Sequence, residues 1–184
     1  MIQIESKVNR EDYIQYNVDY MNHTKKGKEQ KLVLMSSPWI GAIICFLACA
    51  FQEQDAEGYI VLGITAVFLV VFCCFFSWLI NRNIPKRIQR SIAKMEKTNS
   101  FLYAPESIIT LEDEWVEEKS ERETIRVHYD QVFEVLILPH AIYIFESFQR
   151  AFLLPTRCFS SERERKELIE FLKEKVKTVK CFEK

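Results

Sequence analysis

The chain has 184 residues, 28% of them charged, and a formal net charge of −1. These values fit either one soluble domain or a membrane segment joined to a small domain. From Thr98 onward the chain carries 13 basic and 17 acidic residues, so we expect no nucleic-acid partner. The mean hydropathy of −0.09 conceals two apolar blocks, so only the order of residues along the chain is informative.

Residues 1–31 predict a cytoplasmic strand followed by a helix. Apolar and polar residues alternate from Ile2 to Val8, which is typical of a strand. Asn9 can cap a helix whose first turn holds Glu11 and Asp12, because acidic side chains favour the positive end of the helix dipole.

Residues 32–80 predict a transmembrane hairpin with spans at 32–51 and 59–80. Neither block contains a charged residue, and at about 1.5 Å per residue each reaches about 30 Å, the thickness of the hydrocarbon core. The first block is too long for a typical signal peptide, and acidic residues precede it, so we expect no cleavage.

The charges beside these blocks predict their orientation. Lys25, Lys26, Lys28 and Lys31 precede the first block, basic residues follow the second, and the connection 52–58 carries only acidic charges. Basic flanks resist translocation. The pattern predicts a multi-pass protein of the cell membrane with both termini in the cytoplasm.

Small residues recur along one face of the first span and near the outer end of the second. In lipid, small side chains let helices approach closely, so the row can pack the hairpin together, our preferred interpretation, or mediate homodimerisation. Neither span contains an ionisable acid, base or histidine, which argues against a transporter made of this chain alone. The candidate helix-packing residues are Ser37, Gly41, Cys45, Cys49, Gly63 and Ala66.

Residues 81–98 predict a separate basic juxtamembrane helix. Asn83 can cap it and Pro85 suits its first turn. Its charges can bind anionic headgroups, or they can be an ordinary cytoplasmic flank that supports the next domain, which we favour. The candidate headgroup ligands are Lys86, Arg87, Arg90, Lys94 and Lys97.

Residues 99–184 predict a cytoplasmic domain of seven short strands and one helix. Ser161 and Glu164 can form a capping box, and the helix continues on an apolar face from Leu168 to Val179. A bent antiparallel sheet closed at one end by a helix has the plan of a pleckstrin-homology-like (PH-like) barrel. The fold class is therefore an α+β membrane protein. The strands are expected at 101–103, 107–111, 114–118, 124–129, 132–138, 141–145 and 151–154.

This order of parts resembles the bacterial YcxB-like membrane proteins. The resemblance rests on the segment from Glu11 to Tyr13, the hairpin, the basic stretch and the strand-rich domain. Within that domain, the segment from Leu154 to Phe159 resembles the family's segment before the last helix, whereas Tyr129 to Val132 departs from the pattern at its aromatic residue. The resemblance implies a fold and a membrane location, and no catalytic residue.

The sequence shows no recognisable catalytic, cofactor or metal motif. Four scattered glycines exclude a phosphate-binding loop and a dinucleotide fingerprint, and the three histidines fall on different elements. Four of the six cysteines lie in the apolar blocks, so no disulfide framework is expected. We expect a protein that is not an enzyme and has neither cofactor nor metal.

The leading functional hypothesis is a non-catalytic interaction or regulatory module that displays its domain beneath the membrane and binds a protein partner or its own copy. One alternative is recognition of anionic lipids by residues 86–97, together with Arg126 and Arg157. Another is a small accessory subunit of a membrane transporter or envelope enzyme. The acidic run 112–123 is expected to be an exposed hairpin, although it can also receive a basic partner.

Overall fold

The computed structural model describes residues 2–51, 56–97, 104–148 and 150–182. The chain forms two compact units, each described below by itself. One, the sheet domain, combines residues 1–17 with residues 92–184, and the other, the hairpin unit, is residues 18–91.

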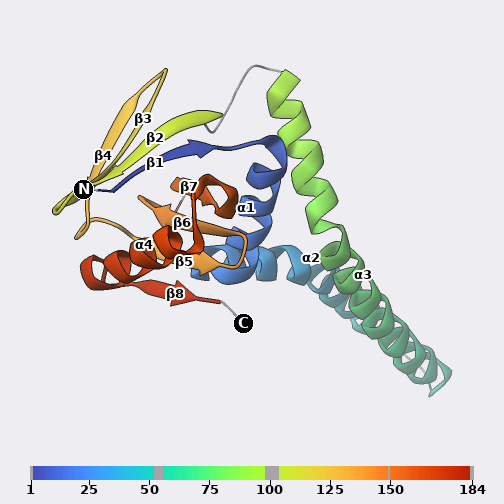
Figure 1. The fold of residues 1–184 in the computed structure, drawn as a ribbon. Helices are drawn as coiled ribbons and strands as arrows, with labels where there is room; N and C mark the ends of the chain where they lie inside the picture. The colour runs from blue at the N-terminus through green and yellow to red at the C-terminus, as the bar shows by residue number, and fades with distance from the viewer. Residues whose placement is uncertain (1, 52–55, 98–103, 149, 183–184) are drawn as a thin grey trace. The chain divides into compact units, whose positions relative to one another are not determined.

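The first sheet of the sheet domain is an antiparallel meander with the order β1-β2-β3-β4 (Figure 1). Its first strand comes from the N-terminus and pairs with the strand that follows the hairpin, with Ile4 opposite Ile109. Along β2, buried and exposed positions alternate, because one face of the sheet covers the core. The strands are β1 (Ile2–Lys7), β2 (Glu106–Leu111), β3 (Trp115–Ser120) and β4 (Thr124–His128).

The second sheet has the order β7-β6-β5-β8. Neighbours are antiparallel except β8, which returns beside β5 in parallel, with Val179 opposite Val135. Every residue of β5 and β6 is buried, so both faces of these two strands are covered. The strands are β5 (Glu134–Leu138), β6 (Ala141–Phe145), β7 (Ala151–Pro155) and β8 (Val179–Cys181).

The main core contains residues of both sheets and of helix α4 (Glu162–Lys175). Ile109 and Val116 of the first sheet, Ile144 of the second, and Leu168 and Leu172 of the helix are all fully buried. As predicted, Ser161 caps α4, and its side chain accepts a hydrogen bond from the Glu164 amide at 3.2 Å.

The other face of the second sheet is covered in part by helix α1 (Arg10–His23), whose first half belongs to the sheet domain. The Tyr16 ring lies 5.3 Å from the Tyr143 ring and 5.9 Å from the Phe145 ring, and its side chain is 6% exposed. Asn9 caps this helix as predicted, because its side chain accepts the Asp12 amide at 2.8 Å. The N-terminal segment is thus an integral part of the sheet domain.

The predicted seven-stranded closed barrel is not confirmed. Two four-stranded sheets that do not close on one another are found instead. The predicted strands from 107 to 154 are present within a few residues of their expected bounds, whereas the one at 101–103 falls outside the described residues. The prediction that the last helix continues to Val179 was wrong, because the helix ends at Lys175 and Val179 belongs to a short strand, β8.

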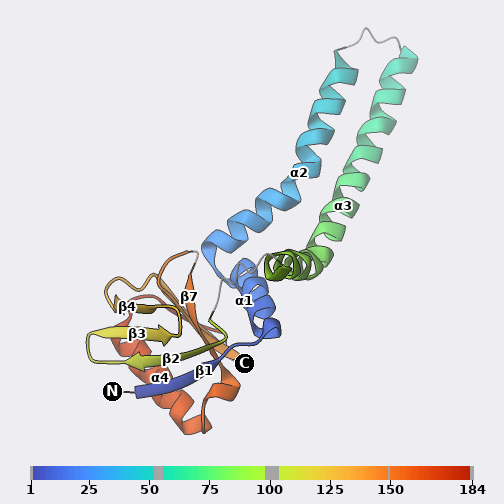
Figure 2. The ribbon, with the colours of Figure 1, turned by 90° about the horizontal axis from the view of Figure 1, so that it is seen from above.

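The hairpin unit contains helix α2 (Lys25–Ala50) and the part of helix α3 (Ala56–Lys97) that ends at residue 91 (Figure 2). Thr24 caps α2 by accepting the Gly27 amide at 2.9 Å. A Cβ atom at Gly27 would lie 2.0 Å from the Tyr20 carbonyl oxygen, so only glycine permits this close approach of α1 and α2.

The prediction of a separate helix over residues 81–98 was wrong, because α3 runs without a break to Lys97. Pro85 lies inside the helix rather than in a first turn. Asn83 is no cap, since its Nδ2 donates to the Leu79 carbonyl within the helix at 2.8 Å. Proline costs one backbone hydrogen bond in a helix, and here the helix on either side of it is continuous.

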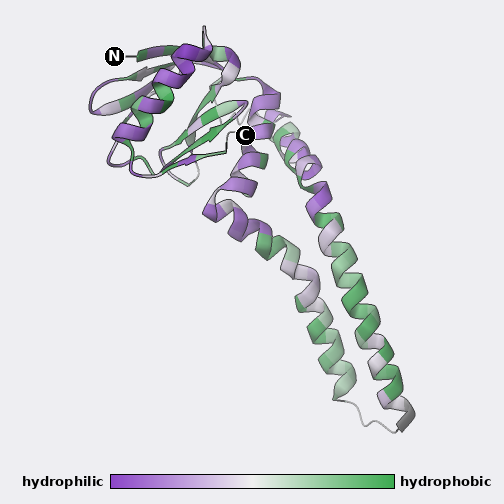
Figure 3. Cartoon of the chain, turned by 60° about the horizontal axis from the view of Figure 1, so that its bottom comes forward, coloured by the Kyte–Doolittle hydropathy of each residue, from purple (hydrophilic) through white to green (hydrophobic). Residues whose placement is uncertain are grey.

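Among the described residues, two helices are long and apolar enough to cross a membrane: Lys25–Ala50 and residues 58–97. Their most apolar windows are 0% and 6% buried in the chain. Figure 3 shows the apolar stretches along both arms of the hairpin. A core helix of a soluble protein would instead be covered by other elements.

Candidate functional site

The two helices of the hairpin are joined by polar contacts near their inner ends, the ends next to the basic flanks. Ser77 Oγ donates to the Met35 carbonyl at 2.9 Å and accepts Trp39 Nε1 at 3.2 Å. One turn further out, Cys73 Sγ lies 3.5 Å from the Pro38 carbonyl oxygen. Cys73 and Ser77 are 0% and 9% exposed, so these contacts lie between the helices.

A hydroxyl group compensates for a proline in the apolar helix α2. Pro38 has no N–H, so the Leu34 carbonyl lacks its usual helical donor. The Ser37 hydroxyl donates to that carbonyl at 2.9 Å. In hydrocarbon an unsatisfied carbonyl costs several kcal/mol, and nearby hydroxyl groups are the usual remedy.

The predicted row of small residues lies outside this contact. Ser37, Gly41, Cys45 and Cys49 are exposed in the single chain, and a Cβ atom at Gly41 would meet no atom within 4 Å. The same holds for Gly63, whereas Ala66 is half-buried. The half-buried face of α2 includes Met35, Pro38, Ala42 and Phe46 instead. Whether the row packs against a second copy stays a prediction.

The predicted headgroup ligands lie on exposed positions of α3. Lys86, Arg87 and Arg90 belong to the hairpin unit, and none of them forms an ion pair with any residue that the structure describes. Lys94 and Lys97 are exposed as well but belong to the sheet domain. The structure therefore divides the predicted set between the two units.

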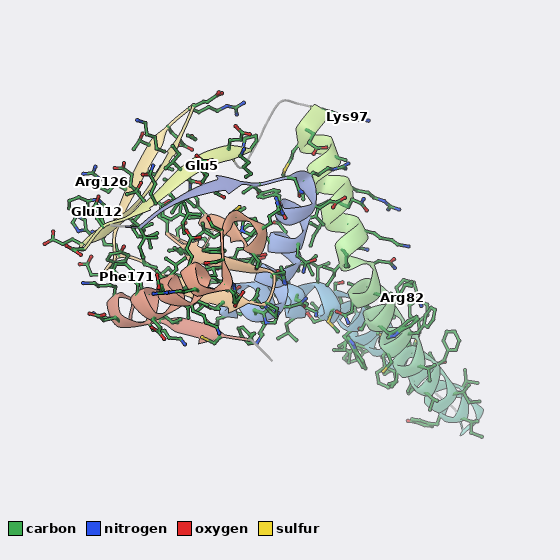
Figure 4. The ribbon with its side chains drawn as sticks, viewed as in Figure 1. Glu5, Arg82, Lys97, Glu112, Arg126 and Phe171 are labelled. Carbon is green, nitrogen blue, oxygen red and sulfur yellow. The ribbon has the colours of Figure 1, made fainter. Side chains whose placement is uncertain are left out.

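The aromatic and basic residues at the inner end of α3 resemble a membrane-interface anchor. The guanidinium of Arg82, which is labelled in Figure 4, lies 5.3 Å from the centre of the Trp78 ring, a cation–π contact. Tryptophan and arginine are common where a helix leaves the hydrocarbon core. Arg82 is also the first charged residue after the apolar stretch of α3.

The sheet domain contains a polar groove of about 540 Å³, which we call the α1 groove. Its floor is Ala141, Tyr143, Leu153 and Pro155, and all four are buried. Its rims carry acidic and polar groups of α1 on one side and basic and hydroxyl groups on the other. The rim residues are Glu11, Asp12, Gln15, His140, Thr156 and Arg157.

An ion pair crosses the α1 groove between Asp12 and Arg157. Arg157 donates to both carboxylate oxygens of Asp12, and also to the Lys7 carbonyl at 2.6 Å. Burial raises the pKa of Asp12, but hydrogen bonds from Arg157 and the Asn9 amide outweigh it, so the pKa lies below its ordinary value. The same pairing raises the pKa of Arg157.

Two arginines that the sequence suggested as further headgroup ligands have partners within the domain. Arg157 is held by Asp12, and Arg126 lies 2.6 Å from Glu117 with its guanidinium 4.7 Å from the Trp115 ring centre. Neither is therefore available to an anion without losing an internal contact.

Sequence reasoning missed the α1 groove, because its two rims come from opposite ends of the chain. Asp12 was identified only as a helix-start residue and Arg157 only as part of a family segment. The alternating pattern of residues 2–8 was a possible signal. A strand there can pair with the C-terminal domain, and the helix that follows it then lies against the same domain.

No group of three or more metal-ligating side chains occurs among the described residues. The described histidines lie at the end of α1, on β4 and in the turn before β6. His128 is exposed, as expected for a residue on the outer face of a strand.

Comparison with known proteins identifies one part of the chain. Residues 111–172 match the family model of the YcxB-like proteins. No curated protein and no solved structure matches the chain. The matched segment begins at the end of β2 and ends within α4, so it leaves out β1, α1 and the hairpin. The resemblance predicted from the sequence is confirmed for residues 111–172, which match the YcxB-like family model.

Proposed function

We propose that this protein is a non-catalytic, membrane-anchored interaction module. The hairpin anchors the chain in the membrane, and the sheet domain, which contains the YcxB-like segment, binds a protein partner in the cytoplasm. The support comes from the pairing of the first strand, the charges beside the spans and the shape of the α1 groove.

The pairing of β1 with β2 carries the proposal. β1 precedes the hairpin and β2 follows it, yet they pair from Ile2 opposite Leu111 to Lys7 opposite Glu106. Hydrocarbon does not tolerate an open sheet edge, so one folded sheet cannot lie on both sides of a bilayer. The chain between the strands must cross the membrane an even number of times, and the two apolar helices supply two crossings.

The side on which the sheet domain lies follows from the flanking charges. Lysines lie in the first turns of α2, before its uncharged stretch. Lys86, Arg87 and Arg90, which form no ion pair with any described residue, follow the uncharged stretch of α3. Excess Lys and Arg mark the cytoplasmic side of a span. Both termini then lie in the cytoplasm.

The α1 groove supports partner binding. An apolar floor with polar groups of both signs on its rims is the usual composition of a recognition site, in which buried apolar area gives affinity and polar groups fix orientation. Its volume is suited to one or two side chains of a partner rather than to an extended surface.

Point variants test this better than truncation, because removing the residues after 98 would leave β1 without β2. The full chain is purified from membranes with its bound proteins, beside Gln15→Arg on the groove rim and Glu121→Arg on the exposed β3–β4 turn. The proposal expects Gln15→Arg to lose a partner that Glu121→Arg retains. Equal retention in both variants would exclude the groove as the binding site.

A second candidate function is recognition of anionic lipid, because Lys86, Arg87 and Arg90 are exposed and have no acidic partner in the part of the chain that the structure describes. Basic residues next to the surface contribute roughly 1 kcal/mol each to attraction by an anionic leaflet, and salt screens the effect. Vesicle binding that falls with salt, with no protein partner recovered, would favour this candidate.

A further inference from the structure

The hairpin unit contains a crevice of about 430 Å³ between the inner ends of α2 and α3. Ser37 and Pro38 line it from α2, and Phe72 and Phe76 line it from α3. The centres of the two phenylalanine rings are 4.4 Å apart, and the residues that line the crevice from α2 are smaller. Small side chains opposite large ones leave this space open.

The crevice has an apolar end and a polar end. From Phe72 to Arg87 its lining extends about 22 Å along α3 at about 1.5 Å per residue. Phe72 belongs to the uncharged stretch, at the depth of the hydrocarbon core. Arg87 lies about 10 Å beyond Ile80, the last residue of that stretch, which is the level of the headgroups.

Arg87 is the charged group of the crevice. It is exposed and forms no ion pair with any residue that the structure describes. Asn83 lies one turn earlier, with its amide nitrogen already committed to the Leu79 carbonyl. A guanidinium group without an acidic partner, at headgroup level, can bind a phosphate through two parallel hydrogen bonds.

We infer that this crevice binds one anionic phospholipid, with an acyl chain along Phe72 and Phe76 and the headgroup phosphate on Arg87. The inference rests on the proposed membrane anchoring and adds a defined site to it. The crevice is apolar where acyl chains lie and basic where headgroups lie, and this complementarity selects lipid as the occupant. Lys86 and Arg90 stand on the same helix outside the crevice lining.

The test compares single charge removals on one helix. The full chain is extracted in mild detergent and loaded with phosphatidylglycerol or phosphatidylcholine, and native mass spectrometry counts the lipids that stay bound. Arg87→Gln is compared with Lys86→Gln and Arg90→Gln, which remove the same charge. The site predicts one retained phosphatidylglycerol, about tenfold weaker retention for Arg87→Gln, and a change within about twofold for the two controls.

A second pair of variants tests the apolar end without changing any charge. Ser37→Phe fills the crevice, whereas Ser37→Ala removes the same hydroxyl and leaves the space open. The site predicts loss of the bound lipid in the first and retention in the second. Loss in both would assign the effect to the Ser37 hydrogen bond and overturn the crevice as the binding site.

The remaining outcomes separate this inference from the proposed function. Equal loss in all three charge variants would show diffuse electrostatic attraction, and equal retention of the two lipids would show that no anionic headgroup is selected. Either result would overturn the site while leaving the anchor intact. Recovery of the chain in the soluble fraction of lysed cells would contradict the membrane anchoring itself.

Discussion

Replacing Ile4 with alanine should destabilise the sheet domain, although Ile4 lies before the hairpin and outside the family-matched segment. Ile4 is 2% exposed and stands opposite Ile109, which is fully buried in the same core. Large-to-small changes at such positions cost about 2–5 kcal/mol, through lost burial and the cavity left behind. For a domain of this size that corresponds to a fall in melting temperature on the order of 10 °C.

The assay is thermal unfolding of the purified full chain in detergent, followed by hydrogen exchange of amides in β2 and β3. Glu5→Ala is the matched control, because Glu5 is the exposed neighbour on the same strand. We expect Ile4→Ala to melt well below the control and to lose amide protection in β2 first. If the two variants melt at the same temperature, β1 is not part of the domain. The argument that β1 and β2 lie on the same side of the membrane then fails.

Three further predictions concern other contacts. The low pKa of Asp12 means that its pairing with Arg157 stabilises the fold above the unfolded pKa of 3.8 and is lost as pH falls through the lower folded value. Asp12→Asn should therefore cost about 1 kcal/mol at pH 7 in urea unfolding, because Arg157 is half-exposed and screened, and the difference from the native chain should shrink as the pH falls below 3.8. Lys180→Met should lower the free energy of unfolding more than Glu134→Gln in the same assay, because it leaves the Glu134 carboxylate, which is 5% exposed, without its cation. The reverse order would contradict this. Gly27→Ala should cost about 1–3 kcal/mol in thermal unfolding, because its Cβ meets a backbone carbonyl, whereas Lys28→Ala should cost little; equal melting would show that the junction of α1 and α2 adapts.

Local signals in the sequence predicted much of the fold. The two apolar blocks, the strands from β2 to β7 and the caps at Asn9 and Ser161 all depend on periodicity or on residues a few positions apart. These features are determined by backbone hydrogen bonding and burial within one element, so a single sequence suffices to read them.

Features that depend on distant segments were not predicted. The pairing of β1 with β2 spans the whole hairpin, and the Asp12–Arg157 pair joins the two ends of the chain. Helix α3 continues past Pro85, although proline usually marks a first turn. In β8, three residues pair with β5 where an apolar face suggested more helix. These features depend on packing between distant segments, and a local sequence pattern does not indicate that packing.

The candidate headgroup ligands could be named from the sequence because charge next to an apolar block is a local signal. Their roles could not be separated, because only the folded hairpin shows that Arg87 lines the crevice and that Lys86 and Arg90 do not.

The central claim is that β1 and β2 lie on one side of a membrane that the intervening hairpin crosses twice. It is tested with three variants that each replace one residue by cysteine, at Glu5, Asp113 or Asp55. Intact and permeabilised cells are treated with a membrane-impermeant maleimide, and the mass added to each variant is compared with the mass added to the parent chain. The account predicts that the cysteines at 5 and 113 are labelled only after permeabilisation, whereas the one at 55 is labelled in intact cells. Labelling of 5 and 113 from opposite sides, or protection of all three until permeabilisation, would contradict it.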